Sequence, residues 1–334
     1  MSTNHTPTVA TDVRGDAQLT PSAREALGIA SASQGFDAQG ACLLQYNHNW
    51  VLRLPVATPQ GSVIAKVHRS GAERASVTRQ VLIAQWLHDS GIRTARPAGT
   101  RFPVLAAGHL VTFTHDLGDG GPVSAADLGR LLGRLHSLPV PGYLGLPRLD
   151  PAASLLTRIE RLPDHVLDPD DRHWLTTHDR ALVEQFKSSD WPDGPVVLHG
   201  DLATQNTMQT TAGPALIDLE YVSTGPALYD LAFVAWSRDG FSGDPGKYIQ
   251  FCAAYGTDVT AVHGGVLYRR VLAPLRAAVG VVIALEAAVR APSWVDEAAH
   301  RLACVRGQGD PLFAFPWNWS SAIGYTKPPA HAPA

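Results

Sequence analysis

A short polar loop between two apolar runs holds the residues with the clearest chemistry. It reads His199-Gly-Asp201-Leu-Ala-Thr-Gln-Asn206, and Asp218 follows the apolar run 215–217. An aspartate can take the proton of a hydroxyl, and carboxylate and amide oxygens are ligands that Mg²⁺ prefers. Asp201 and Asn206 have the spacing of a phosphoryl-transfer loop, in which the aspartate is the base and the asparagine holds metal. The pattern therefore favours phosphoryl transfer.

The His-Gly-Asp tripeptide by itself could be no more than a tight turn, with Asp218 simply ending a strand, because short motifs also match by chance. Here the context favours chemistry, since apolar runs flank the loop and Asn206 stands at the required offset. We expect Asp201 to be the catalytic base, His199 to belong to the same catalytic loop, and Asn206 and Asp218 to bind Mg²⁺. A metal-dependent hydrolase would need more histidine ligands than the local sequence offers.

The elements that must position this loop form two groups along the chain. Apolar runs at 50–54 and 62–67, separated by turn residues, predict a hairpin, and the apolar residues of 73–89 recur at helical spacing. A further strand is expected at 110–114. After the glycine-rich stretch 116–121 most segments are helical. A small strand-rich unit followed by a mainly helical one is an α+β arrangement.

We divide the chain into four segments on these patterns. Polar composition at the start and prolines at the end predict flexible ends. The segments are an N-terminal extension with a flexible extreme end (1–34), a strand-rich unit expected to bind nucleotide (35–115), a helical unit expected to carry catalysis and substrate binding (116–320), and a proline-rich tail (321–334).

Lys66 lies inside the apolar run 62–67. An isolated lysine in a strand usually points to solvent. The other lysines, Lys187, Lys247 and Lys327, lie in polar or tail segments, and phosphoryl transfer needs a cation on the nucleotide phosphates. We therefore expect Lys66 to supply that cation.

The quoted residues resemble the aminoglycoside-phosphotransferase and choline-kinase superfamily, small-molecule kinases whose catalytic loop carries His-x-Asp followed by Asn. In that family the next strand ends in a metal-binding Asp, as at Asp218. The segment Thr224-Gly-Pro-Ala-Leu-Tyr-Asp230 resembles the family segment in which an aspartate at a helix start supports the catalytic loop, and 128–136 resembles the core helix behind the hinge. The resemblance covers roughly 35–319 and is specific only in the catalytic loop.

This resemblance implies a bilobal protein-kinase-like fold, with a small N-terminal antiparallel sheet plus helix and a larger, mainly helical C-terminal lobe. ATP or GTP would bind between the lobes together with Mg²⁺, and the purine would meet backbone groups of Phe113, Thr114 and His115. The turn 45–49 takes the place of a glycine-rich loop, so that Asn47 and Asn49 would lie near the phosphates. A hairpin turn explains these two asparagines equally well.

The sequence departs from the family at the partner of Lys66. Family members carry an acid on the following helix, whereas the inward polar position here is Gln80. An amide oxygen can accept a hydrogen bond from Lys66 but offers no charge, so the pair would be weaker. Glu73 at the helix start is the other candidate, and Gln80 is equally well explained as a surface amide. The missing acid keeps open a second hypothesis, a nucleotide-binding scaffold without turnover.

The residues that would choose the acceptor are less distinct. The helix expected from about 266 to 290 carries four arginines and one glutamate, whereas a polycationic acceptor would be bound better by carboxylates. This balance favours a neutral or acidic substrate, although arginines usually coat solvated faces. The candidate acceptor contacts are Glu220, Arg269 and Arg276. Three carboxylates keep a cationic acceptor open: Asp164, Asp239 and Asp244.

Composition excludes several other classes. The 334 residues carry a net charge of −3, so there is no basic field for a nucleic-acid partner. The stretch 271–288 is apolar but broken by Pro274, Arg276 and Glu286, which predicts a buried helix and no membrane partner. The first ten residues lack the features of a secretory signal. The cysteines form no Cys-x-x-Cys pair, which suits a reducing, cytoplasmic location: Cys42, Cys252 and Cys304.

The sequence therefore predicts a small-molecule kinase that transfers the γ-phosphoryl group of ATP or GTP to a hydroxyl. One expected role is inactivation of an antibiotic or other natural product, such as a nucleoside, a peptide or an aminoglycoside. A kinase of a simple sugar or amino alcohol in primary metabolism is the alternative.

Overall fold

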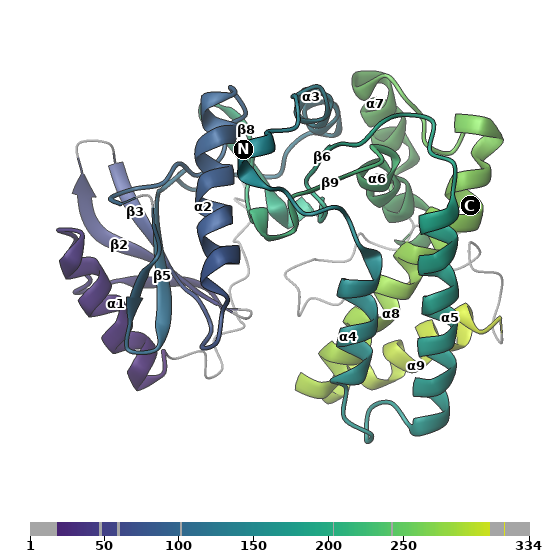
Figure 1. Cartoon of the computed structure of the whole chain (residues 1–334), viewed down its shortest axis with the longest axis horizontal. Coiled ribbons are helices and arrows are strands. Elements are labelled where there is room, and N and C mark those ends of the chain that lie inside the picture. Colours follow the sequence, from purple (N-terminus) through teal and green to yellow (C-terminus); the bar gives the residue numbers. More distant parts are fainter. Residues whose placement is uncertain are drawn as a thin grey trace, which may run out of the picture. The chain divides into compact units, whose positions relative to one another are not determined.

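The structure is a computed structural model that describes residues 19–46, 49–58, 61–100, 102–202, 204–241, 243–307 and 317. The chain forms two compact units (Figure 1). Among the described residues, the first unit holds those up to Val81 and 96–116, and the second holds 82–95 and those from Leu117 onward. The kinase-like fold predicted above is the one observed, with a small antiparallel sheet in one unit and mostly helices in the other.

The first unit is built on a five-stranded sheet in the order β1-β2-β3-β5-β4. Every pair of neighbouring strands is antiparallel. The predicted hairpin is β2–β3, and the strand expected at 110–114 is β5. The strands are β1 (Cys42–Tyr46), β2 (Trp50–Thr58), β3 (Gly61–Val67), β4 (Val104–Ala106) and β5 (His109–His115).

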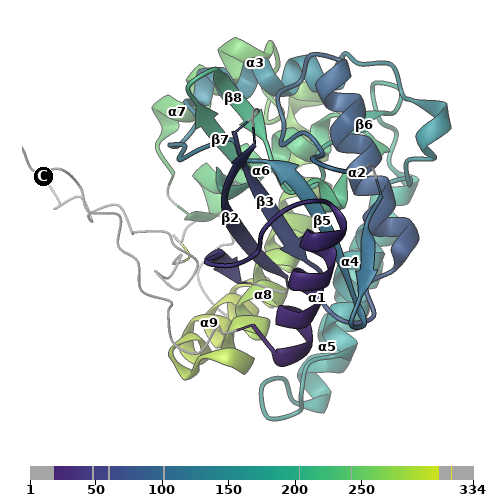
Figure 2. The same ribbon diagram turned by 90° about the vertical axis from the view of Figure 1, so that its left-hand side faces the viewer.

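Helix α1 (Pro21–Ser33) closes one face of this sheet (Figure 2). Thr20 caps the helix by accepting a hydrogen bond from the Ala23 N–H at 3.2 Å, and Pro21 suits the first helical position. Its buried side chains join those of the sheet in one apolar core: Ala23, Ala26, Leu27 and Ala30. The segment that we expected to be an extension thus contributes a core helix, while its extreme end lies outside the described residues, as does the proline-rich tail.

Side chains of β3 alternate between the two faces of the sheet, as a strand requires. Val63, Ala65 and Val67 are fully buried against α1, so Lys66 projects from the opposite face. Lys66 pairs in register with Thr112 of β5, which places both residues on that opposite face. The local sequence therefore separates a core face from a polar face.

Helix α2 (Arg74–Asp89) matches the helix expected at 73–89. It divides between the two units, since residues to Val81 belong to the first and later ones to the second. The apolar positions that defined the pattern are buried: Val77, Val81, Ala84 and Leu87. Gly91, with a φ of 77°, follows the helix end, where a left-handed residue favours glycine.

The second unit is mostly helical. Its helices are α3 (Ala125–His136), α4 (Pro151–Glu160), α5 (Pro169–Ser188), α6 (Leu228–Phe241), α7 (Pro245–Tyr255), α8 (Ala273–Arg290) and α9 (Val295–Val305), and a π-helical turn η5 (Tyr268–Leu272) leads into α8. Two two-stranded ribbons frame the catalytic loop: β6 (Val196–Leu198) with β9 (Ser223–Gly225), and β7 (Thr207–Thr210) with β8 (Gly213–Leu216). Short 3₁₀ turns are η1 (Gly142–Leu144), η2 (Thr204–Asn206), η3 (Leu219–Tyr221), η4 (Val262–Gly265) and η6 (Pro292–Trp294).

The helical span Val262–Arg290, which includes α8, is the one segment of the described residues that is long and apolar enough to cross a membrane. Its most apolar window is 78% buried inside the molecule. Packing against other helices therefore accounts for its composition, as expected for a buried helix.

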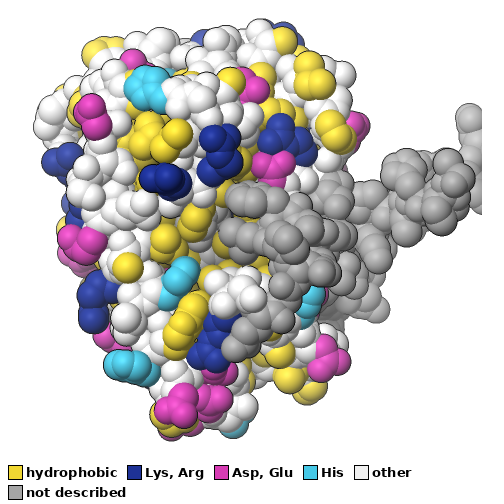
Figure 3. Space-filling view, turned by 90° about the vertical axis from the view of Figure 1, so that its right-hand side faces the viewer, with side chains coloured by type: hydrophobic (Ala, Val, Ile, Leu, Met, Phe, Trp, Pro, Cys, Tyr) yellow, Lys and Arg dark blue, Asp and Glu magenta, His cyan; other side chains and the backbone are white. Residues whose placement is uncertain are grey.

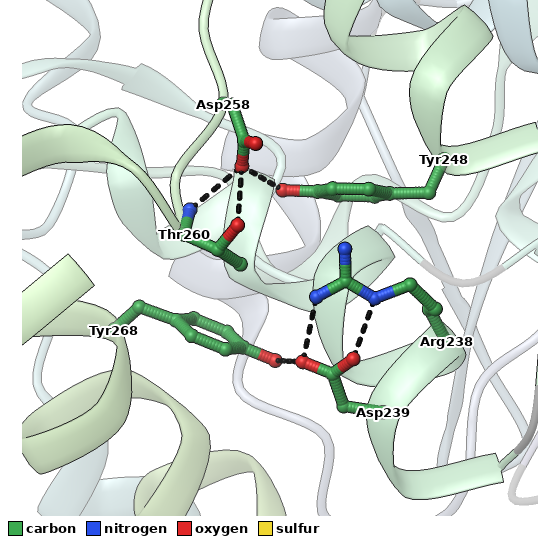
Figure 4. Close-up of polar contacts among 6 residues, drawn as sticks. All are labelled: Arg238, Asp239, Tyr248, Asp258, Thr260 and Tyr268. Carbon is green, nitrogen blue, oxygen red and sulfur yellow. Dashed lines mark hydrogen bonds and ion pairs between the residues drawn. The ribbon is translucent and has the colours of Figure 1, made fainter. Parts of the chain in front are cut away.

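A polar network ties the end of α6 to the segments that follow it (Figure 4). Asp239 accepts hydrogen bonds from two nitrogens of Arg238, at 2.5 and 2.9 Å, and from the Tyr268 hydroxyl at 2.6 Å. One oxygen of Asp258 accepts from the Tyr248 hydroxyl at 2.5 Å and from the N–H and hydroxyl of Thr260. The network fixes η5, and with it the start of α8, against α6.

Candidate active site

The catalytic loop begins with a sharp turn after β6. Gly200 has a φ of 83°, and a Cβ at this position would collide with the carbonyl oxygen of Tyr221. Only glycine combines this left-handed conformation with so close an approach of two backbone segments. The turn thereby sets the position of Asp201, the next residue.

Asp230, an acidic residue in the first turn of α6, stabilises this turn through hydrogen bonds to its backbone. Its two carboxylate oxygens accept the backbone N–H groups of His199 at 2.7 Å and Gly200 at 3.0 Å. His136 Nε2 lies 3.2 Å from the same carboxylate, and its other ring nitrogen lies 2.8 Å from the Tyr255 hydroxyl. Asp230 is fully buried. Burial by itself would raise its pKa, but the His136 contact and the charges of His136 and His199 lower the pKa below its ordinary value.

The imidazole of His199 is fully buried. Its Nε2 lies 3.1 Å from the carbonyl oxygen of Ile217, so this nitrogen donates to the strand end on the other side of the loop. The structure thus places His199 where it holds the loop against the residue that precedes Asp218.

Asn206 joins the parts of the site. Its Nδ2 donates to the carbonyl oxygen of Asp201 at 2.8 Å and to Asp201 Oδ2, also at 2.8 Å. Its backbone carbonyl accepts the Ile217 N–H at 2.9 Å. Because Ile217 precedes Asp218, one residue connects the expected base to the expected metal ligand, and its Oδ1 is the atom left to coordinate a cation.

Asp201 combines partial burial with several charged neighbours. Burial raises the pKa of its carboxyl, while His199, Arg276 and the Asn206 hydrogen bond act to lower it and Asp218 acts to raise it. Asp218 itself is exposed and has a φ of 58°. A non-glycine residue in the left-handed region is strained, and such strain concentrates at functional sites.

The oxygen donors fit Mg²⁺. Magnesium is commonly held by one or two protein ligands together with waters and substrate phosphates, and Asn206 and Asp218 supply one amide and one carboxylate oxygen. In the described part of the chain, no group of three or more His, Cys, Asp or Glu side chains could hold a metal on its own. A bound nucleotide would therefore complete the coordination.

The hinge end of β5 offers the purine less than expected. The N–H of His115 donates to the Arg96 carbonyl at 2.8 Å, and the N–H of Asp116 donates to the Ser62 carbonyl at 2.9 Å. The ring of Phe113 packs on Phe36, with centroids 5.2 Å apart, which places it on the core face of the sheet. Burial and the charge of Arg96 lower the pKa of His115. Thr114 pairs with Ile64 and so shares the face of Lys66.

The other residues expected to contact the nucleotide differ in exposure and in hydrogen bonding. Gln80 is partly buried on α2, and its side chain makes no hydrogen bond within the described residues, while Glu73 is exposed just before the helix. The Asn49 side chain accepts the Arg69 N–H at 3.0 Å. Asn47 lies outside the described residues. Their roles toward nucleotide stay predictions.

The residues expected to contact the acceptor also differ in exposure. Glu220 is exposed beside Asp218, and Arg269 is exposed and donates to the Gly264 carbonyl at 2.7 Å. Arg276 is only 6% exposed and donates to the Tyr229 carbonyl at 2.8 Å. The three carboxylates that left a cationic acceptor open already have partners: Asp164 binds Arg172, Asp239 binds Arg238 and Tyr268, and Asp244 caps α7.

Sequence reasoning missed an ion pair in this region. Arg158 of α4 and Glu286 of α8 form two parallel hydrogen bonds of 2.8 and 2.7 Å. The charges of Tyr221 and Asp201 act on Arg158 as well as that of Glu286, and together they raise the pKa of Arg158 against its burial. No local motif marks this pair, because 128 residues separate its members.

The chain matches a model of a known protein family. The family model described as the phosphotransferase enzyme family matches residues 47–266. The chain belongs to this family. The matched region contains the loop 199–206, Asp230 and the strand that carries Lys66. The chain is accordingly a transferase of the kinase type.

Solved structures show the same fold at low sequence identity. An amicoumacin kinase in complex with AMP-PNP, Ca²⁺ and its ligand has a TM-score of 0.68 and 14% identity, over 88% of this chain and 97% of that one. A microcompartment-associated aminopropanol kinase has a TM-score of 0.61 and 18% identity, over 83% and 96%. A choline/ethanolamine kinase family protein from Mesorhizobium loti has a TM-score of 0.57 and 16% identity, over 86% of this chain and 94% of that one. A search of curated proteins found no match to this phosphotransferase.

The charge distribution of the phosphotransferase is mixed on the face shown in Figure 3. Positive and negative side chains are interspersed there. This face therefore lacks the single-sign field that attracts nucleic acid.

Proposed function

We propose that this protein is a magnesium-dependent phosphotransferase that moves the γ-phosphoryl group of ATP or GTP onto a hydroxyl of a small molecule. The observation that supports the proposal most is the connection through Asn206, which bonds the side chain of Asp201 and the backbone of Ile217 beside Asp218. Asn206 would thereby hold the proposed base, Asp201, and the segment of the proposed metal ligand, Asp218, together, as phosphoryl transfer requires.

In the proposed reaction, Asp201 Oδ accepts the proton of the acceptor hydroxyl as the hydroxyl oxygen bonds to the γ-phosphorus. The bond from that phosphorus to the bridging oxygen breaks, and the nucleoside diphosphate leaves with the electron pair. Mg²⁺ held by Asn206 and Asp218 would offset the charge of the phosphates, and Lys66 would add a further cation. Asp230 keeps the N–H groups of His199 and Gly200 fixed, so Asp201 needs no reorganisation.

The similar solved structures are named as an antibiotic kinase and as kinases of small amino alcohols. We propose that the acceptor is likewise a small hydroxyl compound met in the cytoplasm. Inactivation of an antibiotic or related natural product, and hence resistance, is the favoured role. Phosphorylation of a primary metabolite is the alternative.

A scaffold that binds nucleotide without turnover is the second candidate, and the uncharged Gln80 favours it. The two functions separate in one assay. Purified protein is supplied with ATP or GTP, Mg²⁺ and a panel of aminoglycosides, nucleoside and peptide antibiotics, sugars and amino alcohols, and nucleoside diphosphate release is followed. Acceptor-dependent release supports the kinase, whereas nucleotide binding without release from any acceptor supports the scaffold.

Calorimetry tests the metal ligand separately. Asp218→Ala should abolish the part of nucleotide affinity that depends on magnesium, because a carboxylate ligand of the metal is lost. Titrations with and without Mg²⁺ would measure this. If the variant keeps the magnesium dependence of the wild type, Asp218 is not a ligand.

A further inference from the structure

Helix α8 is buried on almost every side, with one exception. Between 275 and 288, every residue is buried except Val279, Ile283 and Glu286, which are partly exposed. Successive helical residues are about 100° apart, so these three and Arg276 fall within a sector of about 80°. The helix therefore has one narrow stripe, Val279, Ile283 and Glu286, that the other described elements leave partly exposed, and the buried Arg276 lies at one end of it.

The Arg276 end of this stripe lies next to the residues that hold the catalytic loop, because Arg276 donates to the carbonyl of Tyr229 and the next residue, Asp230, accepts the N–H of Gly200 beside Asp201. The Arg276 charge acts on Asp201 and opposes the effect of burial on the pKa of that carboxyl. The guanidinium lies over the rings of Tyr229 at 4.2 Å and Phe233 at 5.0 Å, and it donates to the Tyr229 carbonyl. Its Nε is buried and has no hydrogen-bond partner within the described residues. A buried donor without an acceptor is costly, and a ligand atom beside Asp201 would satisfy it.

The Glu286 end of the stripe carries an ion pair with Arg158. Helix α4 packs against α8, and Arg158 of α4 bonds Glu286 with its Nε and Nη2. The third guanidinium nitrogen, Nη1, is not used in these bonds. Arg158 lies near enough to Asp201 and Tyr221 for both to affect its charged state. Tyr221, which also acts on Arg158, is 52% exposed.

The charges along this surface are matched inside the protein. Glu286 offsets Arg158, and Asp201 offsets Arg276. The groups left for a ligand are N–H donors of the two arginines, beside the apolar side chains of Val279 and Ile283. Asp201 and Asp218 already have partners within the protein, so they offer an ammonium group little gain, whereas they would repel a carboxylate. An uncharged ligand with oxygen acceptors and an apolar face meets neither obstacle.

We propose that the α8 stripe, with Arg158 and Tyr221, is the acceptor-binding wall, and that it selects an uncharged, hydroxyl-rich acceptor such as a sugar ring. Hydroxyl oxygens accept from Arg158 and Arg276, the C–H face of the ring packs on Ile283 and Tyr221, and one hydroxyl faces Asp201. This inference rests on the proposed phosphoryl transfer and adds the acceptor class to it.

Three matched sugars test the acceptor class on the full chain. Glucose is neutral, glucosamine is an ammonium ion below neutral pH, and glucuronate is an anion. With Mg²⁺ and the preferred nucleotide, kcat/KM for glucose should exceed that for either charged sugar by about tenfold or more. Equal or higher values for a charged sugar would overturn the proposal.

Charge variants test the role of the ion pair in the same assay. Glu286→Gln leaves Arg158 unpaired and should shift the ratio of kcat/KM toward glucuronate by about tenfold. Arg158→Gln removes the positive partner of Glu286 and should shift the ratio of kcat/KM toward glucosamine. Opposite shifts in the two variants cannot arise from a general loss of folding. If both variants keep the wild-type ratios, the pair does not contact the acceptor.

A steric variant tests the stripe. Ile283→Trp should lower kcat/KM for the sugar by about tenfold or more, while slow nucleotide hydrolysis by water continues. The matched control is Ile249→Trp on α7, a side chain that is 67% exposed, which should leave both activities unchanged. Equal sugar transfer by the two tryptophan variants would contradict the proposal.

Nucleotide hydrolysis distinguishes this inference from the proposed function. If none of the three sugars is phosphorylated but hydrolysis occurs and Asp201→Asn abolishes it, the acceptor class is wrong and the proposed phosphoryl transfer stands. If hydrolysis is the same in Asp201→Asn, the proposed function itself fails.

Discussion

Two arginines that lie where α6 meets the segment of η5 and α8 differ in their hydrogen bonds. Arg238 and Arg276 each lie 4.2 Å from the centre of a tyrosine ring. Arg238 stands beside Asp239, which links α6 to η5, and Arg276 links α8 to α6. Arg238 gives two nitrogens to Asp239, which also binds the Tyr268 hydroxyl (Figure 4). Arg276 makes one hydrogen bond to a carbonyl, and its buried Nε has no partner in the described residues. The first network is complete and stabilises the fold, whereas the second, beside Asp201, leaves hydrogen-bonding capacity for a ligand.

The largest expected effect lies beside Arg276. Asp201→Asn removes the proton acceptor and should lower kcat by roughly 10² to 10⁴ with little change in nucleotide affinity. Steady-state kinetics and calorimetry measure the two quantities. Turnover near the wild-type rate would remove Asp201 from its role as base.

Asp230 should affect stability as well as activity. Asp230→Asn breaks a fully buried network, so we expect a loss of about 3 kcal/mol in the free energy of unfolding. Because the folded-state pKa is lowered from 3.8, the ionised carboxylate stabilises the fold above that value, and its contribution disappears as the pH falls through the folded-state pKa.

Urea unfolding at several pH values measures this difference. The gap between wild type and Asp230→Asn should be constant at neutral pH and should shrink in acid. Asp164→Asn is the control, because that carboxylate is 79% exposed and its removal should change stability by about 1 kcal/mol or less. A gap that widens in acid would contradict the prediction.

Exchange of the two arginines for methionine compares the complete and the open network directly. Arg238→Met should lower the free energy of unfolding by about 1–3 kcal/mol and leave kcat unchanged. Arg276→Met should lower kcat/KM by about tenfold or more, since an acceptor contact is lost. The comparison fails if Arg238→Met impairs turnover of the folded enzyme as much as Arg276→Met does.

The smallest effect concerns one hydroxyl of the complete network. Tyr268→Phe removes the 2.6 Å hydrogen bond to Asp239 and should cost about 1 kcal/mol of stability. Thermal unfolding would show it. Tyr143→Phe, at a side chain that is 78% exposed, should have no measurable effect and serves as its counterpart.

Local patterns in the sequence predicted much of this architecture. Apolar runs identified β2, β3 and β5, helical spacing identified α2, and the spacing of Asp201 and Asn206 identified the candidate catalytic loop, because each depends on neighbouring residues. Helix α1 was assigned to an extension, since a short alanine-rich stripe resembles a flexible end until a sheet covers it.

Contacts across long sequence separations could not be predicted in this way. Neither His136 against Asp230 nor Arg158 against Glu286 has a local signature, as only the folded chain brings these residues together. The partly exposed stripe of α8 could not be predicted from the sequence for the same reason. Its stripe is defined by what the other helices leave uncovered, not by its own composition.

The separation between Arg158 and Glu286 has a consequence for how new specificities arise. The bond between Asp201 and Asn206 spans five residues, whereas the ion pair spans 128. On the proposed assignments, reactivity and selectivity are encoded in different stretches of the gene, so mutations in α4 or α8 would change the accepted compound without touching the reacting groups. Descendants of such a chain can acquire new targets while they keep the chemistry of their ancestor.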